Sequence, residues 1–155
     1  MNKHHNTIIL SILFLFSLSL SVVPAQSNQV IDQLLQQEKA SFATALYMVQ
    51  TAAGELEEEL PPQTAAEGFD SQEWNLPQIS ADTPITLGQY SQLLMHAFEI
   101  PGGLMYKLFP GPRYAARETH YRGFIRGSAL PGRSLSGSEV LYILREVLEW
   151  KEESA

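Results

Sequence analysis

The stretch "SGSEVLYILREVLE", Ser136 to Glu149, predicts a capped amphipathic helix. Ser136 is able to accept a hydrogen bond from a free backbone N–H, and Glu139, three residues later, completes a capping box. Apolar residues then follow at the i, i+3, i+4, i+7 spacing of a helix that buries one face, namely Val140, Ile143, Leu144 and Val147. A buried face needs other helices to cover it.

Two earlier stretches match this pattern. "TLGQYSQLLMHAFE" starts at Thr86 and has the capping-box partner Gln89, whereas "SFATALYMVQTAAG" starts at Ser41 and has Thr44 in that place. Their apolar positions correspond to those of the Ser136 stretch, being Tyr90, Leu93, Leu94 and Ala97 in the former and Ala45, Met48, Val49 and Ala52 in the latter. The sequence therefore predicts three equivalent helices that turn their apolar faces toward a shared core.

The connectors between these stretches repeat as well. "AAEGFDSQEWNLPQISADTPIT" from Ala65 aligns without a gap on "AARETHYRGFIRGSALPGRSLS" from Ala115, which pairs Trp74 with Phe124. Each connector predicts a short helix followed by a turn-rich stretch. We expect an all-α domain of repeated long helix, loop, short helix and loop units, because no stretch alternates with period two; residues 123–126 would form a strand pair at most.

The amino end predicts export. Residues 1–26 have a polar start with Lys3, a long apolar core, and "VPA" before Gln26, which together are typical of a secretory signal peptide. An uncleaved membrane anchor is the alternative, although the apolar run is short for a span of roughly 20 residues. We expect a short lead-in helix within residues 27–39, one helical domain over 40–150, and a tail over 151–155. The chain has no cysteine, which excludes disulfides and thiolate metal sites.

Charge is divided unevenly along the chain. The formal net charge is −7, which argues against a general nucleic-acid binder. From Ser27 to Ile100 the only basic residue is Lys39, whereas Lys107 to Arg133 holds six basic residues and a single acid. The second connector is therefore predicted to form an electropositive patch on an acidic protein.

The second connector also carries a family resemblance. It reads Gly123-Phe124-Ile125-Arg126-Gly127, then Pro131, Leu135-Ser136 and Glu139, and the preceding long helix is introduced by Pro84-Ile85-Thr86. This pattern resembles the S-layer homology (SLH) module over about residues 40–148. The resemblance implies three units packed as a pseudo-threefold all-α domain that attaches proteins to anionic cell-wall glycans. The arginine of the family's Thr-Arg-Ala-Glu motif is missing from both matching tetrads, at 86–89 and 136–139.

Arginine and aromatic residues of the second connector are the candidate ligand contacts. A guanidinium matches carboxylate geometry and aromatic faces stack on sugar rings. The candidate glycan-binding residues are Arg113, Arg117, Tyr121, Arg122, Arg126, Arg133 and Glu139. Two alternatives stay open: these arginines pair with the acidic first half of the chain, or they contact a partner protein.

The sequence thus favours a non-catalytic exported protein of the periplasm or cell surface. Its expected partner is cell-wall glycan or another envelope protein, with membrane contact only through an uncleaved signal peptide. We expect no cofactor and no metal site, because His96 and His120 lack a metal-ligand spacing and no nucleophile, base and orienting group assemble from the motifs. The apolar run from Leu104 to Phe109 is expected to enter the core; the alternative is an exposed apolar lip.

Overall fold

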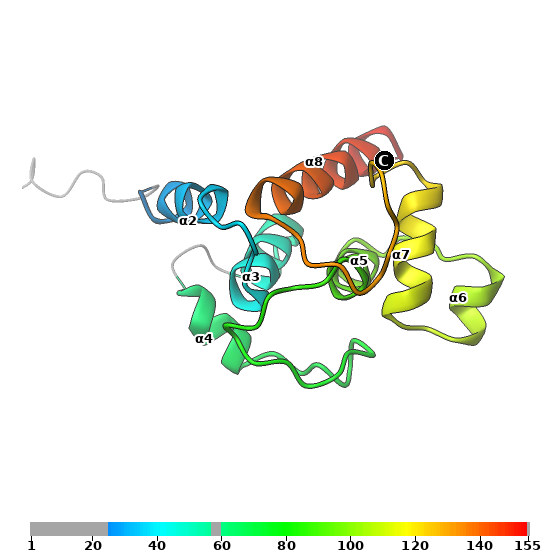
Figure 1. Cartoon of the computed structure of the whole chain (residues 1–155), viewed down its shortest axis with the longest axis horizontal. Helices are drawn as coiled ribbons and strands as arrows, with labels where there is room; N and C mark the ends of the chain where they lie inside the picture. Colours follow the sequence, from blue (N-terminus) through cyan, green and yellow to red (C-terminus); the bar gives the residue numbers. More distant parts are fainter. Residues whose placement is uncertain (1–24, 57–59, 155) are drawn as a thin grey trace, which may run out of the picture.

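The computed structural model describes residues 25–56 and 60–154, which form helices joined by loops (Figure 1). The helices are α2 (Ala25–Leu35), α3 (Phe42–Ala53), α4 (Pro62–Glu67), α5 (Leu87–Ala97), α6 (Leu104–Leu108), α7 (Pro112–Tyr121) and α8 (Gly137–Ser154). These residues contain two isolated β-bridges and no sheet, so the predicted all-α class is confirmed and residues 123–126 form no strand pair. Of the predicted signal peptide, residues 1–24 lie outside the described residues and the last two belong to α2.

The three long helices α3, α5 and α8 begin at the expected caps. Ser41 Oγ accepts a hydrogen bond from the Thr44 N–H at 3.3 Å. Thr86 and Gln89 form the reciprocal capping box, and Ser136 and Glu139 form the second one, with the Ser136 N–H donating to Glu139 Oε2 at 2.9 Å. Each cap satisfies a backbone donor that the helix itself leaves unpaired.

A closed ring of backbone hydrogen bonds joins the starts of these helices. The Ala40 N–H donates to the Leu135 carbonyl at 2.8 Å, the Leu135 N–H donates to the Ile85 carbonyl at 3.1 Å, and the Ile85 N–H donates to the Ala40 carbonyl at 2.8 Å. Each of the three residues directly precedes a helix cap and is fully buried. Because buried backbone groups are costly when unpaired, the ring holds α3, α5 and α8 together at one end.

The apolar faces of α3, α5 and α8 meet in one core. Of the predicted face residues, Ala52 is exposed, Met48 and Ala97 are half-buried, and the others are buried. The short helix α4 packs on α3, α7 packs on α5, and α2 lies against α8. Trp74 and Phe124, which the sequence alignment pairs, are both buried beside these helices. In the described part of the chain, no helix is long and apolar enough to cross a bilayer.

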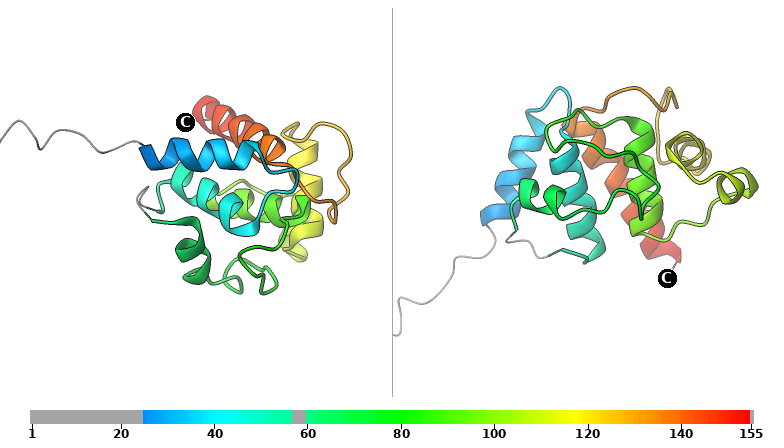
Figure 2. Two further views of the ribbon diagram at one scale, coloured as in Figure 1. Left: turned by 60° about the vertical axis from the view of Figure 1, so that its left-hand side comes forward. Right: turned by 90° about the horizontal axis from the view of Figure 1, so that it is seen from below.

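The apolar run Leu104 to Phe109 does not enter the core, so that expectation is wrong. Leu104, Met105, Leu108 and Phe109 are all exposed. The run forms the five-residue helix α6, which packs on α7 and projects at the end of the molecule opposite α2 (Figures 1 and 2). Only Tyr106 turns inward, where its hydroxyl donates to Gln92 Oε1 at 3.1 Å. A helix of little more than one turn has only one inward position, so its other large side chains stay outside.

Candidate functional site

The seven predicted glycan contacts do not share one groove. Arg113, Arg117 and Tyr121 are exposed along α7, and Arg122 is half-buried at its end. Arg126 and Arg133 lie in the loop between α7 and α8, and Glu139 lies in the first turn of α8. Only the last three come together.

These three residues line a cavity of about 400 Å³, which we call the connector pocket. Its lining is Ile125, Arg126, Arg133, Ser138, Glu139, Tyr142 and Ile143. The Arg126 guanidinium lies over the Tyr142 ring, 4.5 Å from the ring centroid, and Arg133 Nη1 is 2.7 Å from Glu139 Oε1. The pocket therefore combines two guanidinium groups and one carboxylate with two buried isoleucines.

The Glu139 carboxylate belongs to the helix cap as much as to the pocket. Burial raises its pKa, but hydrogen bonds from the Ser136 N–H, the Arg133 guanidinium and the Ser136 hydroxyl outweigh that effect and hold the pKa below its usual value. Glu139 is therefore ionised at neutral pH and compensates part of the Arg133 charge. Arg133 also donates through Nε to the Ser128 carbonyl at 3.0 Å. These contacts fix the orientation of its guanidinium.

Tyr142 is flanked by cations. In addition to Arg126, the guanidinium of Arg145 lies 5.0 Å from the same ring centroid. Arg145 is paired with Glu146 and Glu149 on its own helix, whereas Arg126 is exposed and lines the pocket. A guanidinium that rests on a ring face keeps its in-plane N–H donors directed away from the ring. Arg126 is thus the pocket residue best placed to receive an anion.

Arg122 contacts other parts of the fold rather than the connector pocket. Its Nη2 group donates to the Pro101 carbonyl, and its guanidinium lies 5.4 Å from the Trp150 ring centroid. It therefore ties the end of α7 to the loop after α5 and to the last part of α8. Arg122 is not directed at the connector pocket.

The ion pairs of the described residues bear on the alternative that the connector arginines pair with the acidic first half of the chain. Among the residues that the structure describes, the ion pairs join Arg133 to Glu139 and Arg145 to Glu146 and Glu149. All of these lie in the second half of the chain. Within the described residues, no ion pair therefore joins the basic connector to the acidic first half of the chain.

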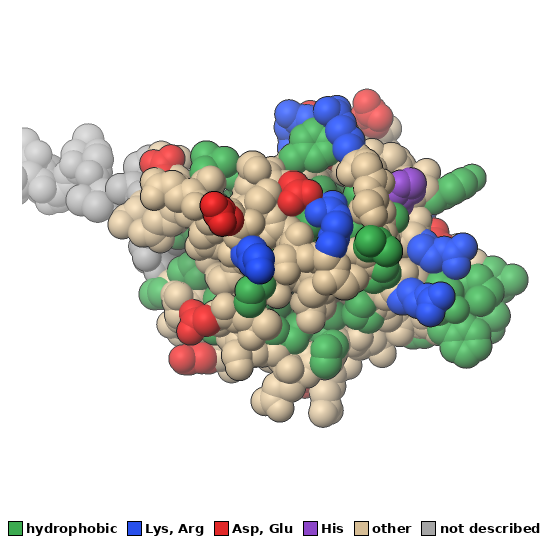
Figure 3. Space-filling view, in the orientation of Figure 1, with side chains coloured by type: hydrophobic (Ala, Val, Ile, Leu, Met, Phe, Trp, Pro, Cys, Tyr) green, Lys and Arg blue, Asp and Glu red, His purple; other side chains and the backbone are tan. Residues whose placement is uncertain are grey.

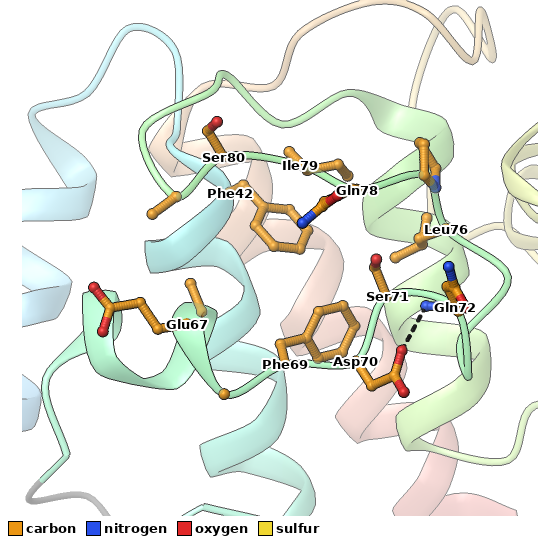
Figure 4. A pocket seen from close by; sticks show the side chains of 14 residues that line it. Phe42, Glu67, Phe69, Asp70, Ser71, Gln72, Leu76, Gln78, Ile79 and Ser80 are labelled. Carbon is orange, nitrogen blue, oxygen red and sulfur yellow. Dashed lines mark hydrogen bonds between the residues drawn. The ribbon is translucent and has the colours of Figure 1, made fainter.

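A second, larger hollow of about 730 Å³ lies between α3, α4 and the loop 68–81, and we call it the first-connector pocket (Figure 4). Phe42, Phe69, Leu76 and Ile79 give it an apolar wall, while Glu67, Gln72 and Gln78 add polar groups. Asp70 accepts a hydrogen bond from the Gln72 N–H at 2.9 Å, which shapes the loop. No Lys or Arg is among its lining residues, so it suits a neutral ligand better than an anion. Of the two aromatic residues in "GFDSQEW", Phe69 lines this pocket, whereas Trp74 is buried against the Phe69 ring and does not line it.

His96 and His120, the histidines among the described residues, lie in contacts that do not resemble a metal site. His96 is exposed and stacks on Trp74 with a ring-centroid distance of 4.4 Å, and His120 Nε2 lies 3.2 Å from the Gly127 carbonyl oxygen. Within residues 25–56 and 60–154, no three His, Asp or Glu side chains gather in a way that would hold a metal ion.

Searches against family models, curated proteins and solved structures find no match to this chain.

Proposed function

We propose that the chain is an exported, non-catalytic cell-envelope protein whose SLH-like module binds an anionic cell-wall glycan through the connector pocket. The observation that carries the proposal is the convergence of Arg126 and Arg133 on one cavity of about 400 Å³. The missing motif arginine of the SLH tetrads is thereby replaced by arginines from the preceding loop. A carboxylate on a sugar is the group that two such guanidinium forks recognise best.

The module itself is proposed to be a pseudo-threefold arrangement of three units. The closed ring formed by Ala40, Ile85 and Leu135 supports this, because each unit contributes the same position, the residue before the cap, and each donates to one neighbour and accepts from the other. The pairing of α4 with α3 and of α7 with α5 supports it as well, since the two short helices occupy corresponding places in the two connectors.

Binding would use the donors that the folded protein leaves over. Arg133 donates hydrogen bonds through Nη1 to Glu139 and through Nε to the Ser128 carbonyl. Because a guanidinium carries five N–H donors, others are left to bind a ligand. Arg126 would supply the second fork, held over the Tyr142 ring. The buried side chains of Ile125 and Ile143 offer an apolar floor for the C–H face of a sugar ring.

The test is retention on purified cell-wall polysaccharide and on peptidoglycan. We expect Arg126→Gln to weaken retention about tenfold or more, because a charge-assisted hydrogen bond is worth about 1.5–3 kcal/mol. Arg145→Gln is the matched control, since this arginine lies against the same ring but does not line the pocket. Retention should also fall as salt rises. Equal retention of the wild type and Arg126→Gln would refute the proposal.

The alternative function is an adaptor that binds another envelope protein through the helical repeat. The first-connector pocket favours it, because its mixed apolar and polar lining without basic residues fits a peptide segment better than an anionic glycan. Absence of retention on every wall fraction, together with loss of envelope-protein binding in Phe69→Ser, would favour the adaptor.

A further inference from the structure

Four large apolar side chains are exposed together on α6 and just after it. Leu104 is 72% exposed, Met105 45%, Leu108 60% and Phe109 59%, and we call this group the α6 tip. In the space-filling view, apolar side chains bulge outward at the corner of the molecule where Figure 1 places α6 (Figure 3). Soluble proteins commonly expose single apolar residues, but a contiguous exposed group usually marks a contact surface.

The α6 tip is convex, and a contact on its inner side holds it against α5. Leu104, Met105 and Leu108 lie at i, i+1 and i+4, which places them on one side of the helix, and Tyr106 anchors the other side through Gln92. Phe109 continues the surface toward α7, where its ring stacks on Tyr114 with centroids 6.2 Å apart. The tip is therefore a held projection with apolar side chains pointing outward.

Basic side chains lie beside the tip. Lys107, Arg113 and Arg117 are all exposed on α6 and α7, and Figure 3 shows Lys and Arg side chains beside the apolar bulge. Between Leu104 and Arg122 the only acid is Glu118. A surface hollow of about 570 Å³ adjoins the tip and is lined by Gly103, Arg117, Glu118, His120, Tyr121 and Ala129. This corner is thus positive, whereas the chain as a whole is negative.

We propose that the α6 tip is a membrane-contact site that enters the interface of a bilayer bearing anionic headgroups. Its apolar side chains would occupy the boundary between headgroups and acyl chains, and Lys107, Arg113 and Arg117 would lie at the lipid phosphates. A bilayer accepts convex apolar groups of any shape, whereas a protein partner needs a matching hollow. The acidic remainder of the molecule is repelled by the same surface, which orients the tip toward it. This contact is separate from the one expected from the sequence, which was confined to residues 1–26.

The absence of cysteine from the chain allows a direct test. An environment-sensitive fluorophore is attached to Leu108→Cys and, as the matched control, to Leu35→Cys, which is also exposed but lies on α2 at the opposite end. Both proteins are mixed with phosphatidylcholine vesicles with and without phosphatidylglycerol. We expect a blue shift, and quenching by spin-labelled acyl chains, for the label at 108 with the anionic vesicles only. Binding that leaves this label unchanged, or that affects both labels equally, would overturn the proposal.

A charge variant tests the other half of the argument. Lys107→Gln/Arg113→Gln/Arg117→Gln should weaken partitioning of the label at 108 onto anionic vesicles on the order of a hundredfold, given the usual contribution of each basic residue near such a surface. Lys39→Gln, far from the tip in sequence, should change it much less. All these side chains are exposed, so circular dichroism should show an unchanged helix content. Undiminished vesicle binding of the triple variant would refute the proposed role of the anionic headgroups, and a blue shift at 108 without vesicles that grows with protein concentration would replace the membrane by a second copy of the chain.

Discussion

Gly137→Ala should dislodge α2 from the domain. Gly137 is buried at the start of α8, where its N–H donates to the Gln37 carbonyl at 3.0 Å. A Cβ at this position would overlap the Leu34 carbonyl oxygen and lie 2.5 Å from the Leu34 carbonyl carbon, whereas ordinary contacts begin at 3.4 Å. Both obstacles are backbone atoms, so no side-chain rotation relieves the clash. The chain around Leu34 has to move.

The size of the effect follows from what α2 buries. Among residues 28–35 of α2, the buried apolar side chains are Val30 and Leu34, and each is worth about 1.5–3 kcal/mol when fully removed from water. If α2 shifts but stays, overpacking costs about 1–3 kcal/mol. If α2 leaves, the lost burial is partly offset by the conformational entropy that the freed helix regains. We therefore expect Gly137→Ala to lower the free energy of unfolding by about 2–4 kcal/mol.

Urea unfolding, followed by the fluorescence of Trp74 and Trp150, measures this loss. A decrease of about 2–4 kcal/mol lowers the urea midpoint by about 1–2 M for a domain of this size. Gly132→Ala is the matched control, because Gly132 is exposed and an added Cβ there meets nothing within 4 Å. Hydrogen exchange should show selective loss of protection in residues 28–35. Equal midpoints for the two variants would refute the packing of α2 against the start of α8.

Three further predictions concern hydrogen bonds inside the domain. Tyr90→Phe removes the buried bond from the Tyr90 hydroxyl to the Val140 carbonyl, 2.9 Å long, and should lower the free energy of unfolding by about 1 kcal/mol in thermal melts. Thr119→Val leaves the buried Ser91 hydroxyl without the bond from Thr119 and should cost about 1–3 kcal/mol in the same assay. The folded-state pKa of Glu139 lies below the ordinary value of 4.5, so its ionised form stabilises the protein above that pH, and this stabilisation is lost as pH falls through the folded pKa. Glu139→Gln should therefore flatten the acid side of the curve of unfolding free energy against pH. An unchanged acid side would contradict this role of Glu139.

The helices were predictable because their signals are local. A capping residue, a partner three residues later and an apolar stripe all act within one helix, so Thr86 with Gln89 and Ser136 with Glu139 could be identified from the sequence and are confirmed as hydrogen-bonded caps. The alignment of the two connectors placed Trp74 and Phe124 at corresponding positions, and both residues are buried.

The fate of the α6 run was not predictable from local pattern. Its hydrophobicity indicated burial, but the direction of a five-residue helix is set by what anchors it, here the contact of Tyr106 with Gln92 on α5. The same holds for Arg122, whose partners Pro101 and Trp150 lie far from it in sequence. The charge pattern of the sequence predicted that the connector arginines form one patch. In the structure, Arg126 and Arg133 line the connector pocket, whereas Arg122 contacts Pro101 and Trp150.

The division of the basic residues assigns different mechanical roles to the two proposed surfaces. The backbone around Arg133 is fixed at the start of α5, since the Leu87 N–H donates to the Arg133 carbonyl and the Gly88 N–H donates to the Pro131 carbonyl, both at 2.8 Å. Two residues after Arg133, Leu135 belongs to the buried ring. The connector pocket is therefore preorganised, which favours a small group with fixed geometry such as a carboxylate.

The α6 tip has the opposite properties. It is attached through one inward tyrosine and one ring stack, it lies at the periphery, and its apolar side chains are exposed on its outer side. A convex surface of this kind offers no pocket that a ligand could fill. Selectivity for a bilayer would therefore come from the charge of the lipid headgroups and from the fluidity of the lipid. If the connector pocket binds a wall polymer and the α6 tip binds lipid, the two activities should be separable. The Lys107→Gln/Arg113→Gln/Arg117→Gln variant should then keep its retention on wall polysaccharide, and Arg126→Gln should keep its vesicle binding. Loss of both activities in either variant would show that the two surfaces are one site.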